Sequence, residues 1–136
     1  MQHALCMAAK RGVDVRLVTP GIPDKRMVYS LTRSYYEPLI RSGVRIYEYT
    51  PGFIHAKSYL VDDTIGVVGT INMDYRSLYL HMECAVLMVG CSALDKLKLD
   101  CIVTMEKSHR VTLQDCKNRK HSLIWQAILR TISPLL

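Results

Sequence analysis

The feature that most constrains the fold is a pattern that occurs twice in the first 52 residues. A glycine starts an apolar, β-branched segment that stops at Thr-Pro-Gly: Gly12 leads to Thr19-Pro20-Gly21, and Gly43 leads to Thr50-Pro51-Gly52. The segment before each glycine has helical spacing, and glycine commonly follows a helix end. Two such units in succession predict an α/β fold with parallel strands joined by a helix, and with both Thr-Pro-Gly loops at one edge of the sheet.

The segment before the first of these glycines raises a separate expectation. Residues 3–11 read as a helix with Leu5, Ala8 and Ala9 on one face, but no Ser, Thr, Asp or Asn precedes it as a cap. A buried helix normally has a cap and an incoming connection. We therefore expect a mixed, largely parallel sheet flanked by helices that lacks its first strand.

Three further strands are predicted after the second Thr-Pro-Gly loop, at residues 54–61, 65–71 and 83–90. The sequence Asp-Asp-Thr joins the first two strands. A short helical turn capped by Asp74 precedes the third strand, which reads as buried.

Helices account for the other segments. Residues 27–43 read as a helix that is kinked or broken at Pro38. Residues 92–136 have the spacing of two or three helices and are expected to form a tail that packs on the sheet. Its apolar stripe favours such packing, with Trp125 in the core or at an interface: Leu123, Ile124, Ile128 and Leu129.

Length and composition indicate one globular domain over residues 1–136, because 49% of the residues are hydrophobic and 22% are charged. No run of about 18 apolar residues is present to predict a membrane-spanning helix. The formal charge of +6 suits an anionic partner, but the basic residues are scattered, which argues against nucleic acid. Five cysteines without a Cys-x-x-Cys pair argue against zinc and against a disulfide framework.

Four polar residues interrupt the first two of those later strands. His55 and Lys57 are two residues apart, as are Thr70 and Asn72, so each pair projects from one face of its strand. If the connecting loop has an even length, as with a two-residue Asp63-Thr64 loop, all four side chains share one face. An odd loop would place the two pairs on opposite faces.

Such a cluster has a definite chemistry. The imidazole of His55 can attack or protonate, while Lys57 by charge and Thr70 and Asn72 by hydrogen bonds can hold phosphate oxygens. Asp62 has the opposite parity, so we expect a supporting or turn role for it. Glu83, at the start of the next strand, could orient His55 through the second ring nitrogen.

The alternative is an ordinary polar face on an edge hairpin, which would explain most isolated His-x-Lys pairs. The sequence here, GFIHAKSYLVDDTIGVVGTINMDYRS, adds an Asp five positions after the Lys and a Gly-Thr-x-Asn element at a fixed offset. This combination is too specific for an ordinary polar face.

The chain resembles the phospholipase D superfamily. The sequence HAKSYLVD fits its H-x-K-x4-D motif, and GTIN is similar to its G-[ST]-x-N element. More narrowly, it resembles the carboxy-terminal half of bacterial cardiolipin synthases, in AAKRGVDVRLVTPGIPDK, LIRSGVRIYEYTPGFIHAK, NMDYRSLYLHMECAVLMVG and the terminal ISPLL. The resemblance covers nearly the whole chain and implies one half of a phospholipase D-type fold.

The resemblance also implies a reaction: transfer of a phosphatidyl group between two phosphatidylglycerol molecules, through a phosphohistidine and without a metal or other cofactor. It implies catalytic roles for His55, Lys57 and Asp62, phosphate binding by Lys57, Thr70 and Asn72, and orientation of His55 by Glu83. Partners would be an anionic phospholipid, a membrane surface and a second motif-bearing half, and the location would be the cell membrane. Which histidine is the nucleophile stays open.

Two other interpretations remain. A single-motif phosphodiesterase or nuclease could build its site by homodimerisation, with His55 of both copies facing one phosphate. An inactive truncated half could instead bind a complementary partner. The other histidines lack the His-x-Lys pattern and read as surface residues: His3, His81, His109 and His121.

Overall fold

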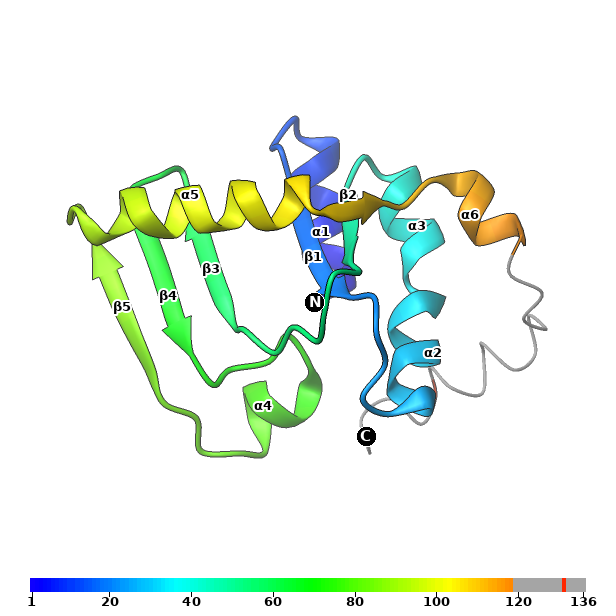
Figure 1. The fold of residues 1–136 in the computed structure, drawn as a ribbon, viewed down its shortest axis with the longest axis horizontal. Coiled ribbons are helices and arrows are strands. Elements are labelled where there is room, and N and C mark those ends of the chain that lie inside the picture. Colours follow the sequence, from blue (N-terminus) through cyan, green and yellow to red (C-terminus); the bar gives the residue numbers. More distant parts are fainter. Residues whose placement is uncertain (119–130, 132–136) are drawn as a thin grey trace.

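The computed structural model describes residues 1–118 and residue 131. It contains two three-stranded sheets that lie beside each other, with strand orders β1-β2-β6 and β3-β4-β5 (Figure 1). The strands are β1 (Arg16–Pro20), β2 (Arg45–Tyr49), β3 (Ser58–Val61), β4 (Ile65–Gly69), β5 (Ala85–Val89) and β6 (Ser108–Arg110). The helices are α1 (Gln2–Lys10), α2 (Arg26–Ser34), α3 (Tyr36–Arg41), α4 (Tyr75–Tyr79), α5 (Ala93–Glu106) and α6 (Leu113–Asn118).

The first sheet contains the two helix–strand units predicted from the sequence. Strands β1 and β2 pair in parallel, from Arg16 opposite Arg45 to Pro20 opposite Tyr49. Both Thr-Pro-Gly loops therefore leave the same edge of this sheet, as predicted. At that edge the Gly21 amide donates to the Tyr49 carbonyl at 2.8 Å, and a Cβ at Gly21 would lie only 2.5 Å from the same oxygen. A glycine is thus required for the loop to approach β2 this closely.

The core lies between this sheet and the helices that flank it. Its buried members are Tyr36, Leu39, Val44, Ile46 and Val111. Partly buried apolar side chains from α1, β1 and α6 complete it, among them Leu5, Ala9, Leu17 and Cys116.

The helix predicted at residues 27–43 is two helices, and the position predicted for the break was wrong. The break lies at Tyr35, between α2 and α3, whereas Pro38 lies in the first turn of α3. A proline is tolerated there because its missing N–H would have no partner within the helix.

The second sheet is antiparallel throughout, and α5 lies across one of its faces (Figure 1). Gly66 allows this packing, since a Cβ there would lie 2.7 Å from Leu94 and 3.0 Å from Leu97 of the helix. The prediction that β5 is buried was wrong. Val86 and Leu87 are 63% and 65% exposed, because β5 is an edge strand of the sheet.

The α/β class and the flanking helices are confirmed, but the pairing is less parallel than expected. Among the described strands, β1–β2 is the parallel pair and the other three pairings are antiparallel. The segment after β5 also differs from a purely helical tail, because β6 pairs with β2 between α5 and α6. The predicted stripe at residues 123–129 and Trp125 lie outside the described residues.

Candidate functional site

The candidate site is built at the edge where β1, β2 and β4 end and β3 and β5 begin. Residues 52–57 run from the second Thr-Pro-Gly loop to β3 along this edge, which is at the bottom of Figure 1. His55 lies in this segment and is exposed, with its ring stacked on Phe53 at a centroid distance of 5.7 Å. Lys57 is half-buried, and its Nζ donates to the His55 carbonyl at 2.8 Å.

The hairpin register predicted from the sequence was wrong. Ser58 lies opposite Val68 and Val61 opposite Ile65, so the turn has three residues rather than two. Asp62 and Asp63 both adopt positive φ, at 49° and 57°, a conformation that aspartate tolerates better than most residues. A two-residue Asp63-Thr64 loop would instead pair Asp62 with Ile65, which differs from the observed register by one residue.

This register changes how the polar residues come together. By strict alternation Lys57 lies opposite Gly69 rather than Thr70, and the Gly69 amide donates to the Lys57 carbonyl at 3.1 Å. Thr70 and Asn72, however, lie beyond the end of β4, where alternation no longer holds. The polar residues therefore meet at a sheet edge instead of on a sheet face.

Glu83 is the residue around which they gather. The Thr70 hydroxyl donates to the Glu83 carboxylate and also accepts from the Cys84 amide at 3.1 Å. The hydrogen bond from Thr70, a second from Ser77 and the nearby charge of Lys57 hold the pKa of Glu83 below its usual value of 4.5. Glu83 is therefore ionised at neutral pH, and it can balance the positive charge of Lys57.

The predicted role of Glu83 in orienting His55 remains a prediction. Within the described part of the chain, Glu83 makes its hydrogen bonds with Thr70 and Ser77, and none with His55. The Glu83 carboxylate nevertheless lies at the same edge as the His55 segment.

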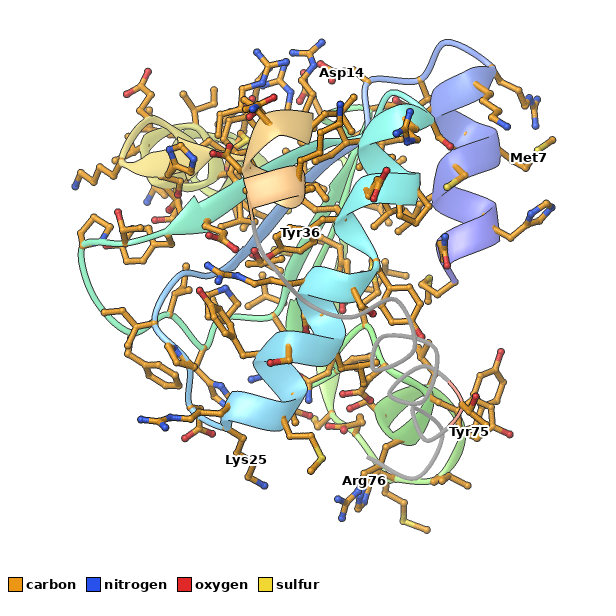
Figure 2. The ribbon with its side chains drawn as sticks, turned by 90° about the vertical axis from the view of Figure 1, so that its right-hand side faces the viewer. Met7, Asp14, Lys25, Tyr36, Tyr75 and Arg76 are labelled. Carbon is orange, nitrogen blue, oxygen red and sulfur yellow. The ribbon has the colours of Figure 1, made fainter. Side chains whose placement is uncertain are left out.

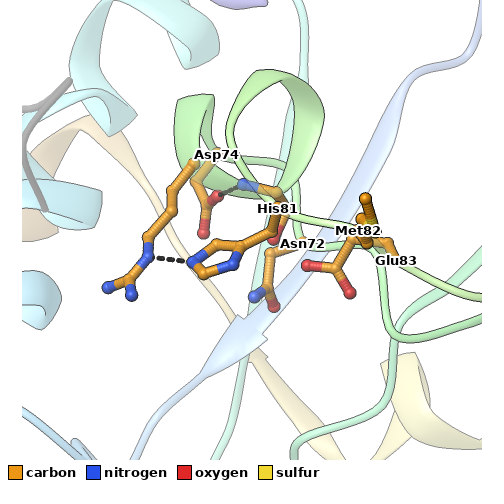
Figure 3. A pocket seen from close by; sticks show the side chains of 7 residues that line it. Asn72, Asp74, His81, Met82 and Glu83 are labelled. Atoms are coloured by element: carbon orange, nitrogen blue, oxygen red, sulfur yellow. Dashed lines mark hydrogen bonds between the residues drawn. The ribbon is translucent and has the colours of Figure 1, made fainter.

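A polar pocket of about 400 Å³ adjoins Glu83. Figure 3 shows Asn72, His81 and Glu83 pointing into it, with Asp74 behind them. The full lining is Asn72, Asp74, Arg76, Ser77, His81, Met82 and Glu83.

The local sequence explains the shape of this pocket. Asp74 is in an extended conformation and accepts from the Ser77 amide at 2.7 Å, which confirms the predicted cap of α4. Arg76 then extends from α4 to the loop that follows, where its Nε donates to Nε2 of His81. His81 is exposed, as predicted, but its contact with Arg76 was not predicted, nor was any role for Arg76 or Ser77. The signal that could have found them is the spacing of Asp74, Ser77 and Glu83 around a short capped helix.

Asp62 lies away from this cluster. It is in the turn after β3, whereas His55 precedes β3, so the two residues are at opposite ends of the strand. The neighbouring Asp63 forms an ion pair with Lys98 of α5 at 2.5 Å. Asp62 thus lies in the turn, which is one of the two roles expected for it, and its catalytic contribution stays a prediction.

The arrangement can hold a phosphate at an open edge. An ammonium, a hydroxyl and an amide lie near the Glu83 carboxylate, and the exposed imidazole of His55 belongs to a segment at the same sheet edge. The described residues contain no group of three or more His, Cys, Asp or Glu side chains placed to hold a metal ion.

Comparisons with known proteins identify the family of the chain. The family model described as "Cardiolipin synthase, PLD-like domain" matches residues 1–99. The whole chain is 47% identical to an uncharacterised protein of Streptococcus mutans, covering 30% of that protein. It is 42% identical over 98% of its length to a cardiolipin synthase of Alkalihalophilus pseudofirmus, covering 27% of that enzyme. The chain thus spans less than a third of the length of these two relatives.

A solved structure supports the fold. The chain is similar to a phospholipase D family member, Nuc from Salmonella typhimurium, with a TM-score of 0.66. The match covers 81% of this chain and 72% of the other, at 21% identity.

Proposed function

Because the chain belongs to the family of phospholipase D-like domains of cardiolipin synthase, we propose that it provides one of two half-sites of a phosphatidyltransferase. The reaction would join two phosphatidylglycerol molecules into cardiolipin and release glycerol. The observation that carries this proposal is the gathering of Lys57, Thr70 and Asn72 around Glu83, at the same sheet edge as the exposed His55.

The reaction would consist of two successive displacements at phosphorus. A histidine nitrogen attacks, a phosphorus–nitrogen bond forms, and the bond to the leaving glycerol oxygen breaks while a second histidine protonates that oxygen. A glycerol hydroxyl of the acceptor lipid then gives its proton back to the second histidine and attacks phosphorus. The phosphorus–nitrogen bond breaks, and the first imidazole is released unchanged. His55 is one of the two histidines.

The other polar residues would stabilise the charge on the transferred group. Lys57 would neutralise the non-bridging phosphate oxygens, and Thr70 and Asn72 would donate hydrogen bonds to them. Without substrate, the one hydroxyl proton of Thr70 is donated to Glu83. With substrate bound it would be donated to a phosphate oxygen instead, which would leave the Glu83 carboxylate to orient the His55 ring. Asp62 would support the hairpin that carries Lys57.

A second half-site is needed because attack and departure occur on opposite sides of phosphorus. One imidazole on one edge cannot serve both sides. The exposure of His55 supports the proposal, since a partner that carries a second motif could approach it directly. That partner would be a complementary half or, in the alternative form of the proposal, a second copy of this chain acting as a phosphodiesterase or nuclease.

The substrate implies association with the cell membrane. No helix among the described residues is both long and apolar enough to span a bilayer. Contact with lipid in this part of the chain would therefore have to be made at a surface.

The test uses a water-soluble phosphodiester and the chain alone. A complementary-half site predicts no hydrolysis above background and a monomer at micromolar concentration. A homodimer site predicts hydrolysis that is lost in His55→Ala and retained in His3→Ala, together with a dimer in analytical ultracentrifugation. Hydrolysis that survives His55→Ala would refute the catalytic assignment in both forms.

A further inference from the structure

An exposed apolar surface lies beside the polar pocket, on α4 and the residues that flank it. Within residues 73–82, six large apolar side chains are between 39% and 103% exposed. We call them the α4 surface: Met73, Tyr75, Leu78, Tyr79, Leu80 and Met82. So many exposed large apolar side chains in ten consecutive residues are uncommon on a protein that has no partner for them.

The start of α2 extends this surface. Ile22 and Met27 are 44% and 52% exposed there, and Lys25 and Arg26 lie between them in the sequence. Lys25 lies at the lower end of the molecule in Figure 2, as Tyr75 and Arg76 do, and in Figure 1 α4 and the start of α2 both lie at that end. The exposed apolar groups and basic groups of two elements therefore share one end of the molecule.

That end also carries the sheet edge at which the candidate site is built. The residues after β1, β2 and β4 leave their sheets there, and these include the segment that carries His55 and Lys57. From this placement we infer that the α4 surface and the start of α2 form a docking surface for an anionic lipid bilayer. Binding to the bilayer does not require catalysis. Only its consequence, that the edge with His55 is brought to the lipid headgroups, rests on the proposed function.

The chemistry of the surface favours a lipid interface over a purely apolar contact. Tyrosine is enriched where one end of a side chain is in apolar surroundings and the other in water. The rings of Tyr75 and Tyr79 pack together at a centroid distance of 4.8 Å and are 49% and 72% exposed, so they form an exposed aromatic pair. Leu80 and Met82, which follow, are 64% and 103% exposed. Side chains this exposed can enter the headgroup region without any change in the fold.

Charge at this end is also complementary to anionic lipid. Glu83 can balance Lys57 and Asp24 adjoins Lys25, whereas Arg26 and Arg76 form no ion pair with the described residues. The terminal nitrogens of Arg76 also make no hydrogen bond with the described residues, because only its Nε is used. Arg76 can therefore bind a lipid phosphate at the polar pocket, which it lines.

The test is co-sedimentation of the chain with vesicles of pure phosphatidylcholine or of phosphatidylcholine with phosphatidylglycerol. Leu80→Ser is compared with Leu99→Ser, because Leu99 is 62% exposed but lies on α5 at the opposite end of the molecule. We expect Leu80→Ser to weaken partitioning roughly tenfold and Leu99→Ser to leave it unchanged. Circular dichroism verifies that both variants are folded.

A second pair of variants tests the charge. Arg76→Gln should weaken binding to phosphatidylglycerol vesicles about fivefold, as expected for one basic residue near an anionic surface, and should not affect binding to neutral vesicles. Lys107→Gln, at the end of α5, should change neither.

Equal effects of Leu80→Ser and Leu99→Ser would overturn the proposal, and so would binding without preference for anionic vesicles. Loss of self-association in Leu80→Ser with unchanged vesicle binding would show that the surface contacts protein instead. Vesicle binding requires no turnover, so the chain can bind vesicles and yet show no transferase activity. It can equally show transferase activity without the predicted vesicle binding, so the two proposals fail separately.

Discussion

Substitution of Gly69 by alanine tests how the site is built. Gly69 ends β4, directly before Thr70, and it faces the start of β5. A Cβ at this position would lie 2.3 Å from the Cys84 carbonyl oxygen and 2.5 Å from the Ala85 Cα. Ordinary contacts of a Cβ begin at 3.4 Å, so β5 would have to move by about 1 Å.

The expected loss of stability follows from what that movement breaks. Thr70 donates its amide to the Cys84 carbonyl at 2.9 Å, and the Cys84 amide donates to the Thr70 hydroxyl at 3.1 Å. Each of these hydrogen bonds contributes about 1 kcal/mol, and overpacking adds about 1–3 kcal/mol. We expect Gly69→Ala to reduce the free energy of unfolding by about 3–5 kcal/mol, a large part of the roughly 5–15 kcal/mol typical of a domain.

The measurement is urea denaturation followed by circular dichroism, with Gly52→Ala as the matched control. A Cβ at Gly52 would meet nothing within 4 Å, and its φ is not in the left-handed region. Gly52→Ala should therefore be neutral or slightly stabilising. If the two variants differ by less than 0.5 kcal/mol (about the scatter of harmless surface substitutions), the close approach of β4 and β5 at Thr70 is wrong.

Three further substitutions probe the elements around the site. Glu48→Ala should cost about 3–5 kcal/mol in thermal denaturation, because Glu48 is 3% exposed and accepts two hydrogen bonds of 2.7 Å from Arg33, whose charge would lose its partner; a loss below 1 kcal/mol would contradict this. Asp74→Ala should cost about 1 kcal/mol through loss of the α4 cap, measured in the same way, and Asp74→Asn should recover most of it. In Thr70→Val, an NMR titration should show the pKa of Glu83 returning toward 4.5 from its lowered value. Because the folded-state pKa of Glu83 is depressed, its ionised form stabilises the protein above about pH 4.5, and this contribution is lost as the pH falls toward the folded-state pKa. Thr70→Val should therefore lose less stability on acidification than the parent.

The first sheet was largely predictable because its signals are local. The glycine after each helix and the Thr-Pro-Gly loops fix the ends of β1 and β2, and the parallel pairing follows from the helix between them. Pro38 misled the prediction, since a proline in a first turn looks in sequence like a proline inside a helix. β6 has only three residues and forms because β2 offers it an edge, which its own sequence does not reveal.

The site was predictable in its members but not in its arrangement. His55, Lys57, Thr70 and Asn72 stand out by type and spacing, but the hairpin register depends on two aspartates in positive φ. Such a turn is stabilised by contacts from outside it, here the Lys98 ion pair and a hydrogen bond from the Gly90 amide to the Thr64 carbonyl at 2.9 Å.

The pocket residues were missed for a related reason. Arg76 and His81 form their contact across a short helix and the loop after it, and neither residue has a distinctive spacing of its own. Their proximity depends on the Asp74 cap, which sets the direction of α4.

The central claim is that His55 is one of two histidines and that the second must come from another half-site. The most direct measurement is phosphatidyl transfer between phosphatidylglycerol molecules in mixed micelles, by this chain combined with a separately produced half that carries the first motif. The claim predicts cardiolipin from the combination, none from either half alone, and none when the chain carries His55→Ala, whereas His109→Ala should retain transfer. Equal transfer by the His55→Ala combination and the parent combination would contradict it.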